Sequence, residues 1–180
     1  KEILKFGDET HEKYNNPNLK LKIQDRLEKN IQMLNLSDLI IGVSNDVKNN
    51  LIKYGVEESR VIVQHIGSLI AEKNIKHTKK IDKNNIVFGF IGGVGYYKGV
   101  HLLSRAYMSL PPELKDKCCI KVYGKGDENY IKAIQNELKD DPYSSKVIFY
   151  GKFTPNDIES ITNSIDISVL PSLCADTAPQ

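Results

Sequence analysis

The stretch Ile86-Val-Phe-Gly-Phe-Ile-Gly-Gly-Val-Gly-Tyr-Tyr-Lys-Gly99 decides the fold class of this chain. Its first six residues predict a buried β-strand, and the glycine-rich run after them opens a helix over Val100–Leu110. Further strands are predicted at Ile120–Tyr123, Val147–Tyr150 and Ile165–Leu170. Helices are predicted between them: one over Glu128–Leu138, and a short one before the last strand that Thr154 is placed to cap. Strands and helices that alternate at this spacing predict an α/β fold: a Rossmann-like parallel sheet with helices on both faces.

A smaller β-α-β unit precedes that series. Leu39–Val43 is a short, all-apolar run, which predicts a strand buried on both faces. Ser44 is placed to cap the next helix, Gly55 is placed to end it, and Arg60–His65 returns as a strand. Before this unit, apolar residues four positions apart predict an amphipathic helix over Leu19–Leu34.

The composition changes between the two units, over residues 68–85. This segment is rich in lysine, which is typical of a solvated linker, and a basic binding patch is the alternative. We therefore expect residues 1–67 to be the last part of an N-terminal domain and residues 86–180 to be a truncated C-terminal domain. The chain starts at Lys1 rather than at Met, and we expect it to be a piece of a longer polypeptide.

The overall composition argues against several functions. The 25 basic and 23 acidic side chains give a net charge of +2, which offers no electrostatic basis for binding nucleic acid. No apolar run approaches the roughly 20 residues that span a bilayer. The three cysteines, Cys118, Cys119 and Cys174, do not have the spacing of a zinc site. We expect a cytoplasmic protein whose cysteines are reduced.

The loop Gly92–Gly99 is the strongest candidate for a binding site. Backbone amides at the start of a helix attract anions, and the glycines allow close approach. The loop is not a dinucleotide fingerprint, because Lys98 stands at the third glycine position, and it lacks the Gly-Lys-Ser/Thr of a P-loop. A cation at a helix start opposes the helix dipole unless an anion compensates. Lys98 is therefore a candidate phosphate ligand, with an exposed surface lysine as the alternative.

Other polar residues follow the remaining strands. Gly124–Asp127 is either a second ligand loop or a simple turn. Lys152 is followed by Phe153, whose ring either covers a nucleotide base or fills the sheet edge. Asp176, just before a predicted helix start, either binds sugar hydroxyls or caps that helix. His101 is expected to be a surface or packing residue.

Taken together, these segments resemble the GT-B nucleotide-sugar glycosyltransferases, specifically the "group 1" family of retaining enzymes. The matching blocks, in the order of the family, are Ser37–Ser44 with Leu51–Gly55 and Val63–Gly67, then Phe90–Leu103, then Val122–Asp127 and Val147–Gly151, and finally Ser164–Ser172 followed by Asp176–Pro179. The last block resembles the opening of the Glu-(seven residues)-Glu motif of the family. The resemblance implies that residues 86–180 bind the sugar donor and that the smaller unit ends the acceptor domain.

The resemblance also implies roles for single residues. Lys98 would neutralise the donor diphosphate, with the amides of Gly92 and Gly93 nearby. Asp176 would contact the transferred sugar, so that Lys98 and Asp176 are the implied catalytic residues. The remaining implied donor contacts come from Lys152 and Phe153, which would hold the base, and from the amides of Thr177 and Ala178. The implied mechanism needs no metal or cofactor, because fixed positive groups stabilise the leaving nucleoside diphosphate.

The implied partners are a nucleotide-sugar donor and a carbohydrate or lipid-linked acceptor. Peripheral association with the inner face of the membrane, through the rest of the N-terminal domain, is left open. Three departures from the family matter: Gly93 stands where many members carry arginine, Asp176 is shorter than glutamate, and the second glutamate would fall beyond Gln180. We therefore expect the 180-residue chain by itself to bind donor weakly and not to turn over.

Two other functions stay open at this point. One is a GT-B-shaped sugar-nucleotide epimerase, which would need catalytic carboxylates and histidines that the sequence does not display. The other is a nucleotide-binding module without chemistry. A glutamate eight positions after Asp176 would favour the transferase over the module.

Overall fold

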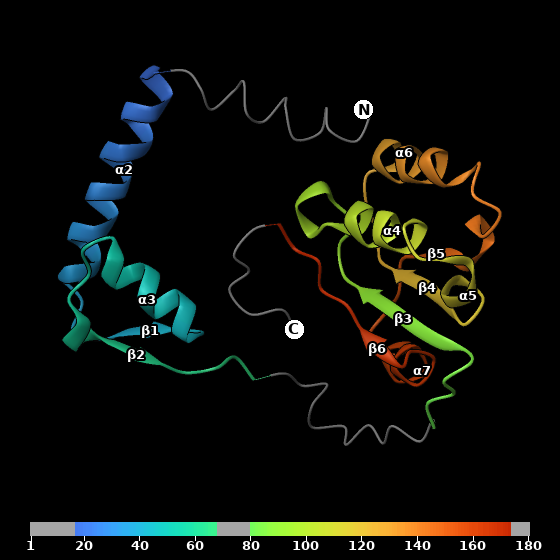
Figure 1. The fold of residues 1–180 in the computed structure, drawn as a ribbon. Helices are drawn as coiled ribbons and strands as arrows, with labels where there is room; N and C mark the ends of the chain where they lie inside the picture. Colours follow the sequence, from blue (N-terminus) through green and yellow to red (C-terminus); the bar gives the residue numbers. More distant parts are fainter. Residues whose placement is uncertain (1–16, 68–79, 174–180) are drawn as a thin grey trace. The chain divides into compact units, whose positions relative to one another are not determined.

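The computed structural model describes residues 17–67 and 80–173, and the chain divides into two compact units. The described parts of these units are residues 17–67 and residues 80–173, which Figure 1 draws in colour. Within these ranges no helix has the length and apolar character needed to cross a membrane.

The smaller unit contains two parallel strands and two α-helices. Its elements are α2 (Pro17–Asn35), β1 (Ile40–Gly42), α3 (Asn45–Lys53), the 3-10 turn η1 (Glu58–Arg60) and β2 (Val61–Val63). The Ser44 hydroxyl accepts a hydrogen bond from the Val47 N–H at 3.2 Å, and Gly55 ends the helix with a positive φ of 104°. The predicted capping and termination of α3 are therefore confirmed.

The prediction that the first strand is buried on both faces is wrong. Ile40 and Val61 are buried with Val56 against α2 and α3, but Ile41 is 54% exposed. The two helices contact only the face that carries Ile40, so alternate residues of β1 face away from the core. The helix before β1 also starts earlier than predicted, at Pro17, which is compatible with a first helical turn.

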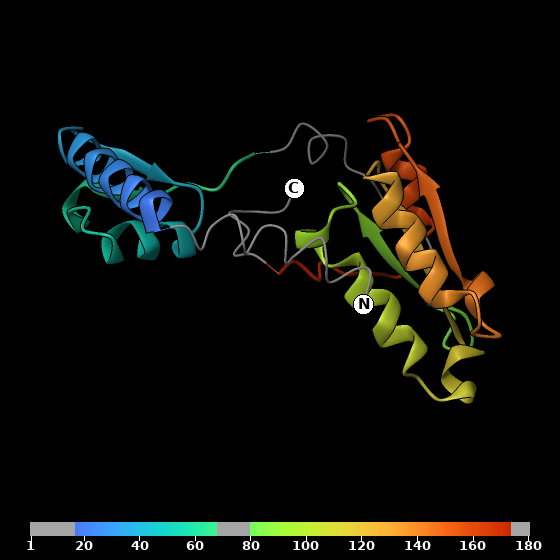
Figure 2. The same cartoon turned by 90° about the horizontal axis from the view of Figure 1, so that it is seen from above.

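The larger unit is a four-stranded parallel sheet with strand order β5-β4-β3-β6. Its elements in chain order are β3 (Ile86–Ile91), η3 (Tyr96–Lys98), α4 (Val100–Met108), α5 (Pro112–Lys115), β4 (Cys118–Tyr123), α6 (Glu128–Leu138), η4 (Ser144–Lys146), β5 (Val147–Gly151), α7 (Ile158–Asn163) and β6 (Ile167–Ser168). Figure 2 shows α4 and α6 side by side. The predicted α/β fold is confirmed.

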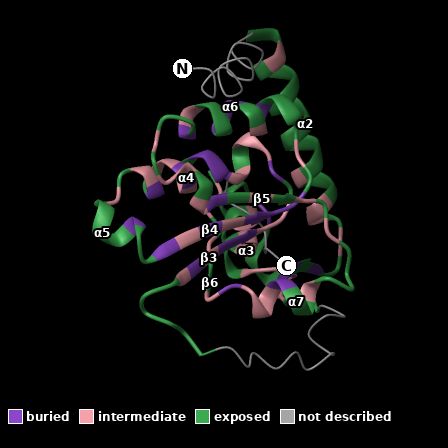
Figure 3. Ribbon diagram, turned by 90° about the vertical axis from the view of Figure 1, so that its right-hand side faces the viewer, coloured by how far each residue is buried: buried purple, intermediate pink, exposed green. Residues whose placement is uncertain are grey.

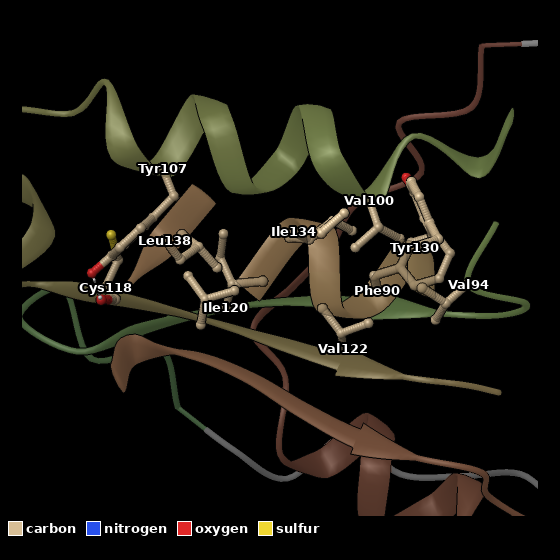
Figure 4. Close-up of a cluster of buried hydrophobic side chains, with 12 residues drawn as sticks. Phe90, Val94, Val100, Tyr107, Cys118, Ile120, Val122, Tyr130, Ile134 and Leu138 are labelled. Carbon is tan, nitrogen blue, oxygen red and sulfur yellow. Dashed lines mark hydrogen bonds between the residues drawn. The ribbon is translucent and has the colours of Figure 1, made fainter. Parts of the chain in front are cut away.

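The core of this unit lies between the sheet and the pair α4 and α6. Figure 4 shows its side chains, which include Phe90 from β3, Ile120 and Val122 from β4, and Ile134 from α6. A second cluster, formed by Tyr123, Ile161 and Ile165, packs α7 against the sheet. Figure 3 shows that the buried residues concentrate on the central strands β3 and β4 and on the inward sides of the helices. A sheet of this kind directs the carboxyl ends of its strands toward one edge.

Three details of the predicted elements differ from the structure. The last strand is only Ile167–Ser168, because the Ile165 N–H donates to the Thr162 carbonyl at 3.3 Å in the turn after α7. The Ile165 side chain packs over Gly89, where any β-carbon would overlap it. The short helix α5 is missing from the prediction. Thr154 does not cap α7, which begins at Ile158; its N–H and hydroxyl instead donate to the Asp157 carboxylate, both at 2.8 Å.

Candidate functional site

The loops that follow the strands meet at the carboxyl edge of the larger sheet, and we call this group of loops the crest. It consists of residues 92–99 after β3, 124–127 after β4, 151–153 at the end of β5 and 169–173 after β6. Backbone hydrogen bonds join neighbouring loops: the Gly124 N–H donates to the Gly151 carbonyl at 2.7 Å, and the Leu173 N–H donates to the Tyr97 carbonyl at 2.8 Å. The loops after β3 and β4 are joined in the same way by the Val94 N–H, which donates to the Lys125 carbonyl at 2.9 Å. The crest is therefore one connected structure.

Glycines allow the crest loops to pack backbone against backbone. A β-carbon on Gly124, whose φ is 152°, would overlap the carbonyl oxygen of Gly92. A β-carbon on Gly99, whose φ is 72°, would overlap the carbonyl of Pro171. These two positions therefore require glycine for both conformation and space. The Pro-Ser turn after β6 is thereby fixed against the start of α4.

Gly93 is a glycine of a different kind. It is exposed, and nothing lies within 4 Å of the β-carbon position there. The Val94 N–H next to it donates to the Lys125 carbonyl at 2.9 Å, and Val94 pairs with Gly126 in a parallel bridge. That register sets Lys125, whose side chain is exposed, beside Gly93. Open space over a glycine, with a lysine from the next loop beside it, can admit an anion.

Lys98 lies two residues before the first residue of α4, as the predicted helix start at Val100 implies. It ends the 3-10 turn η3, and Gly99 then starts α4 without a side-chain cap. Its side chain is half-buried. The structure thus brings Gly92, Gly93 and Lys98 into one loop at the crest, as expected, and a role in phosphate binding stays a prediction.

The side chains of the two residues that were expected to hold a base have different environments. Lys152 is exposed after β5, whereas the half-buried Phe153 packs against the cluster of Tyr123, Ile161 and Ile165. The Phe153 ring therefore fills the sheet edge, which was one of its two predicted uses. Any contact that its main chain makes with a base is a prediction. Asp176, Thr177 and Ala178 lie outside the described residues.

A buried polar cluster beneath the crest is missing from the sequence-based prediction. His101 in α4 is 2% exposed, and its Nδ1 lies 2.6 Å from the hydroxyl of Tyr130 in α6. The His101 ring stacks on Tyr96 of η3, with centroids 5.0 Å apart. Burial lowers the pKa of His101 and raises the pKa of Tyr130 to about 12. The only sequence signal was a histidine and a tyrosine in the first turns of the helices that follow the first two strands of the sheet-forming series.

The described part of the chain contains no candidate metal site. Within residues 17–67 and 80–173, no three His, Cys, Asp or Glu side chains are grouped so that they could hold an ion. The positive groups at the crest are instead lysines: Lys98, Lys125 and Lys152 each follow a different strand.

Several solved structures resemble this chain at 15 to 18% sequence identity, which shows the fold. HepE of Anabaena, solved in complex with UDP and glucose, has a TM-score of 0.66 at 18% identity; the match covers 86% of this chain and 43% of that one. Sucrose-phosphate synthase of Thermosynechococcus elongatus has a TM-score of 0.63 at 15% identity, over 89% of this chain and 41% of that one. WaaG, a glycosyltransferase involved in lipopolysaccharide biosynthesis, has a TM-score of 0.57 at 18% identity, over 74% of this chain and 38% of that one.

Sequence comparison agrees with the fold. An uncharacterized glycosyltransferase of Methanocaldococcus jannaschii, MJ1069, is 30% identical over 139 residues, which are 74% of this chain. The match spans only about a third (34%) of the length of that relative. The family model described as "Glycosyl transferases group 1" matches residues 71–176, which contain every described loop of the crest. The chain therefore belongs to the group 1 family of glycosyltransferases, with the GT-B fold that its sequence predicts.

Proposed function

We propose that this chain carries the donor-binding part of an enzyme that transfers a sugar from a nucleotide-diphosphate sugar to an acceptor with retention of configuration. The observation that carries the proposal is the crest, where Gly93 is open to solvent next to Lys125 and in the same loop as Lys98. A diphosphate that approaches this loop would meet backbone amides and ammonium groups of the protein.

In this proposal Lys98 and the amides of Gly92 and Gly93 bind the diphosphate. Their fixed positive charge stabilises the negative charge that develops on the leaving nucleoside diphosphate, which is electrostatic catalysis that uses the protein's own groups. Lys152 and the main chain of Phe153 hold the base. Asp176 contacts the transferred sugar, and the amides of Thr177 and Ala178 bind sugar or phosphate oxygens. The smaller unit is the end of the acceptor domain.

The known ligands of a structural neighbour support the choice of donor. HepE has been solved with UDP and with UDP-glucose, which makes uridine diphosphate the first ligand to test. The acceptor is a carbohydrate or a lipid-linked sugar in our proposal. Membership of the group 1 family supports this reaction class.

Calorimetric titration of the full-length protein with UDP, GDP and ADP tests the donor site. We expect one of the three to bind, and Lys98→Ala to weaken its binding about 10- to 100-fold, since a hydrogen bond to a charged group contributes about 1.5–3 kcal/mol. Lys139→Ala is the matched control, because Lys139 is an exposed lysine at the other end of α6. Binding that is unaffected by Lys98→Ala, or no binding of any nucleotide, would contradict the proposal.

A further inference from the structure

The start of α4 is held by a residue of another helix. Gly99 precedes the helix and provides no side-chain cap, so its first N–H groups need other partners. The His101 backbone N–H donates to the hydroxyl of Tyr130 at 3.3 Å, and Tyr130 belongs to the first turn of α6. Figure 4 shows Tyr130 beside Val100, the first residue of α4. The Tyr130 hydroxyl thus acts where a capping side chain would.

The same hydroxyl also contacts the His101 side chain, and that contact reaches the crest. Nδ1 of His101 lies 2.6 Å from the Tyr130 hydroxyl, and both residues are almost fully buried, at 2% and 1% exposure. The His101 ring is nearly parallel to the Tyr96 ring, at an interplanar angle of 12°. Tyr96 lies two residues before Lys98 in η3. One buried hydroxyl therefore links α6 to the loop that carries Lys98.

The arrangement of protons makes this link depend on the charge of His101. When the imidazole is neutral with its proton on Nε2, Nδ1 accepts the Tyr130 hydroxyl proton, while the hydroxyl oxygen accepts the His101 N–H. When the imidazole is protonated, Nδ1 becomes a donor and can no longer accept that proton. The hydroxyl would then face two donors in a buried site, where an unmet hydrogen bond is costly.

Burial affects the pKa of His101 more than the charged groups around it do. Arg105 of α4 and Glu137 of α6 form a two-bonded ion pair, with nitrogen-oxygen distances of 2.9 and 2.8 Å. The arginine lowers the pKa of His101 and the glutamate raises it, whereas burial, the largest cause, lowers it. The rings of Tyr96 and Tyr130 complete the surroundings, in contact with the imidazole.

We propose that Tyr130 and neutral His101 are a positioning pair that holds the Gly92–Gly99 loop, and with it Lys98, in the conformation that binds the donor diphosphate. This inference rests on the proposed function, because it concerns how the donor loop of that same site is held. Neither residue touches the substrate. The pair acts through the start of α4 and through Tyr96, and protonation of His101 releases the loop.

The test compares Tyr130→Phe with Tyr107→Phe in the full-length protein. Both changes remove one buried hydroxyl from the same core, but the Tyr107 hydroxyl contacts the carbonyls of Lys115 and Cys118, far from the crest (Figure 4). Amide hydrogen exchange is measured over residues 92–103. We expect Tyr130→Phe to speed exchange there about tenfold and to weaken UDP-glucose binding about tenfold. We expect Tyr107→Phe to do neither.

The pH dependence separates positioning from simple packing. UDP-glucose is the probe because its diphosphate, unlike a terminal phosphate with a pKa near 6, keeps its charge over this range. Binding to the wild type should weaken as the pH falls through the pKa of folded His101, which burial lowers below the ordinary value of 6.5. His101→Asn, which keeps a neutral acceptor, should flatten this dependence.

Unchanged exchange and unchanged binding in Tyr130→Phe would overturn the inference, as would equal effects of the two tyrosine variants. If the wild type binds no sugar nucleotide at any pH, the proposed function fails. The exchange comparison then still decides whether Tyr130 holds the loop.

Discussion

The two edges of the larger sheet use lysine in opposite ways. At the amino edge, the Lys115 ammonium lies 2.6 Å from the Asp141 carboxylate, with the side chains only 9% and 15% exposed. Lys146 there donates to the carbonyls of Lys115 and Asp116, at 3.0 and 2.6 Å. At the carboxyl edge, Lys125 and Lys152 are exposed, and neither side chain has an ion pair or hydrogen bond within the described residues.

This difference distinguishes lysines that take part in the packing of the fold from lysines that, in our proposal, bind the donor. A lysine with a buried carboxylate partner contributes to stability, because removal of the partner would leave a charge without compensation. An exposed lysine on a glycine-rich loop contributes little to stability. Mutation of a lysine at the amino edge should therefore lower stability, and mutation of a lysine at the carboxyl edge should lower donor affinity.

The largest effect on the fold is expected from Gly124→Ala. The new β-carbon would overlap the Gly92 carbonyl, and a φ of 152° disfavours any other residue. We expect the free energy of unfolding to fall by more than about 2 kcal/mol in a urea titration. Gly93→Ala is the matched control, since it enters open space and should stay within about 0.5 kcal/mol of the wild type. Equal losses would show that the crest loops are not packed as described.

A smaller loss is expected from Lys115→Met at the amino edge. The Lys115 ammonium, the largest cause, and the Tyr143 N–H lower the pKa of Asp141 below 3.8. The pair therefore stabilises the fold at neutral pH, and this stability is lost as the pH falls through the lowered pKa. The variant should be less stable at pH 7 than the wild type. Its free energy of unfolding should fall less than that of the wild type on acidification. If the nucleotide affinity of this variant falls along with its stability, the two edges do not differ in function as we describe.

A still smaller effect should appear in the pH dependence of stability through His101. Unfolded His101 takes up a proton near pH 6.5, whereas burial lowers the pKa of the folded residue. The free energy of unfolding should therefore be highest above pH 6.5 and decrease as the pH falls toward the lowered pKa. Urea titrations from pH 5 to pH 8 measure this slope. His101→Asn should reduce it, and a slope of the opposite sign would show that the folded histidine is charged.

The smallest effect is expected from Lys125→Met. Stability should stay within about 0.5 kcal/mol of the wild type, because the side chain is exposed. UDP affinity should fall about threefold, less than for Lys98→Ala, because an exposed charge acts through solvent. Isothermal calorimetry at two salt concentrations measures the UDP affinity of the variant and of the wild type. The difference between these two affinities should shrink at high salt. An affinity equal to wild type at low salt would exclude Lys125 from the site.

Much of the fold follows from local pattern, and the exceptions follow from a turn and from tertiary contacts. The bounds of β3 and α6 match the prediction to the residue, because apolar spacing and a capping Asp127 determine them locally. The last strand is shorter than predicted, because the Ile165 N–H donates to the Thr162 carbonyl in the turn after α7 and the strand begins only at Ile167. The burial of Ile41 was mispredicted because apolar character alone does not say whether a second layer covers a strand.

The candidate site was predictable to the level of loops. Glycine and lysine after a strand identified Gly92–Gly99, and the structure joins that loop to its neighbours. The contact between Tyr130 and His101 was not predictable, because a buried hydrogen bond between helices depends on their packing rather than on any motif. The position of Lys125 beside Gly93 likewise depends on the register of two loops.

Amide hydrogen exchange with and without UDP-glucose, resolved along the chain, is the most direct test of donor binding at the crest. We predict slower exchange in residues 92–99, 124–127 and 151–153 when the ligand is present, and no change in residues 112–117 or 141–146 at the amino edge. Protection confined to the amino edge, or absent from all the crest loops at saturating ligand, would contradict the account.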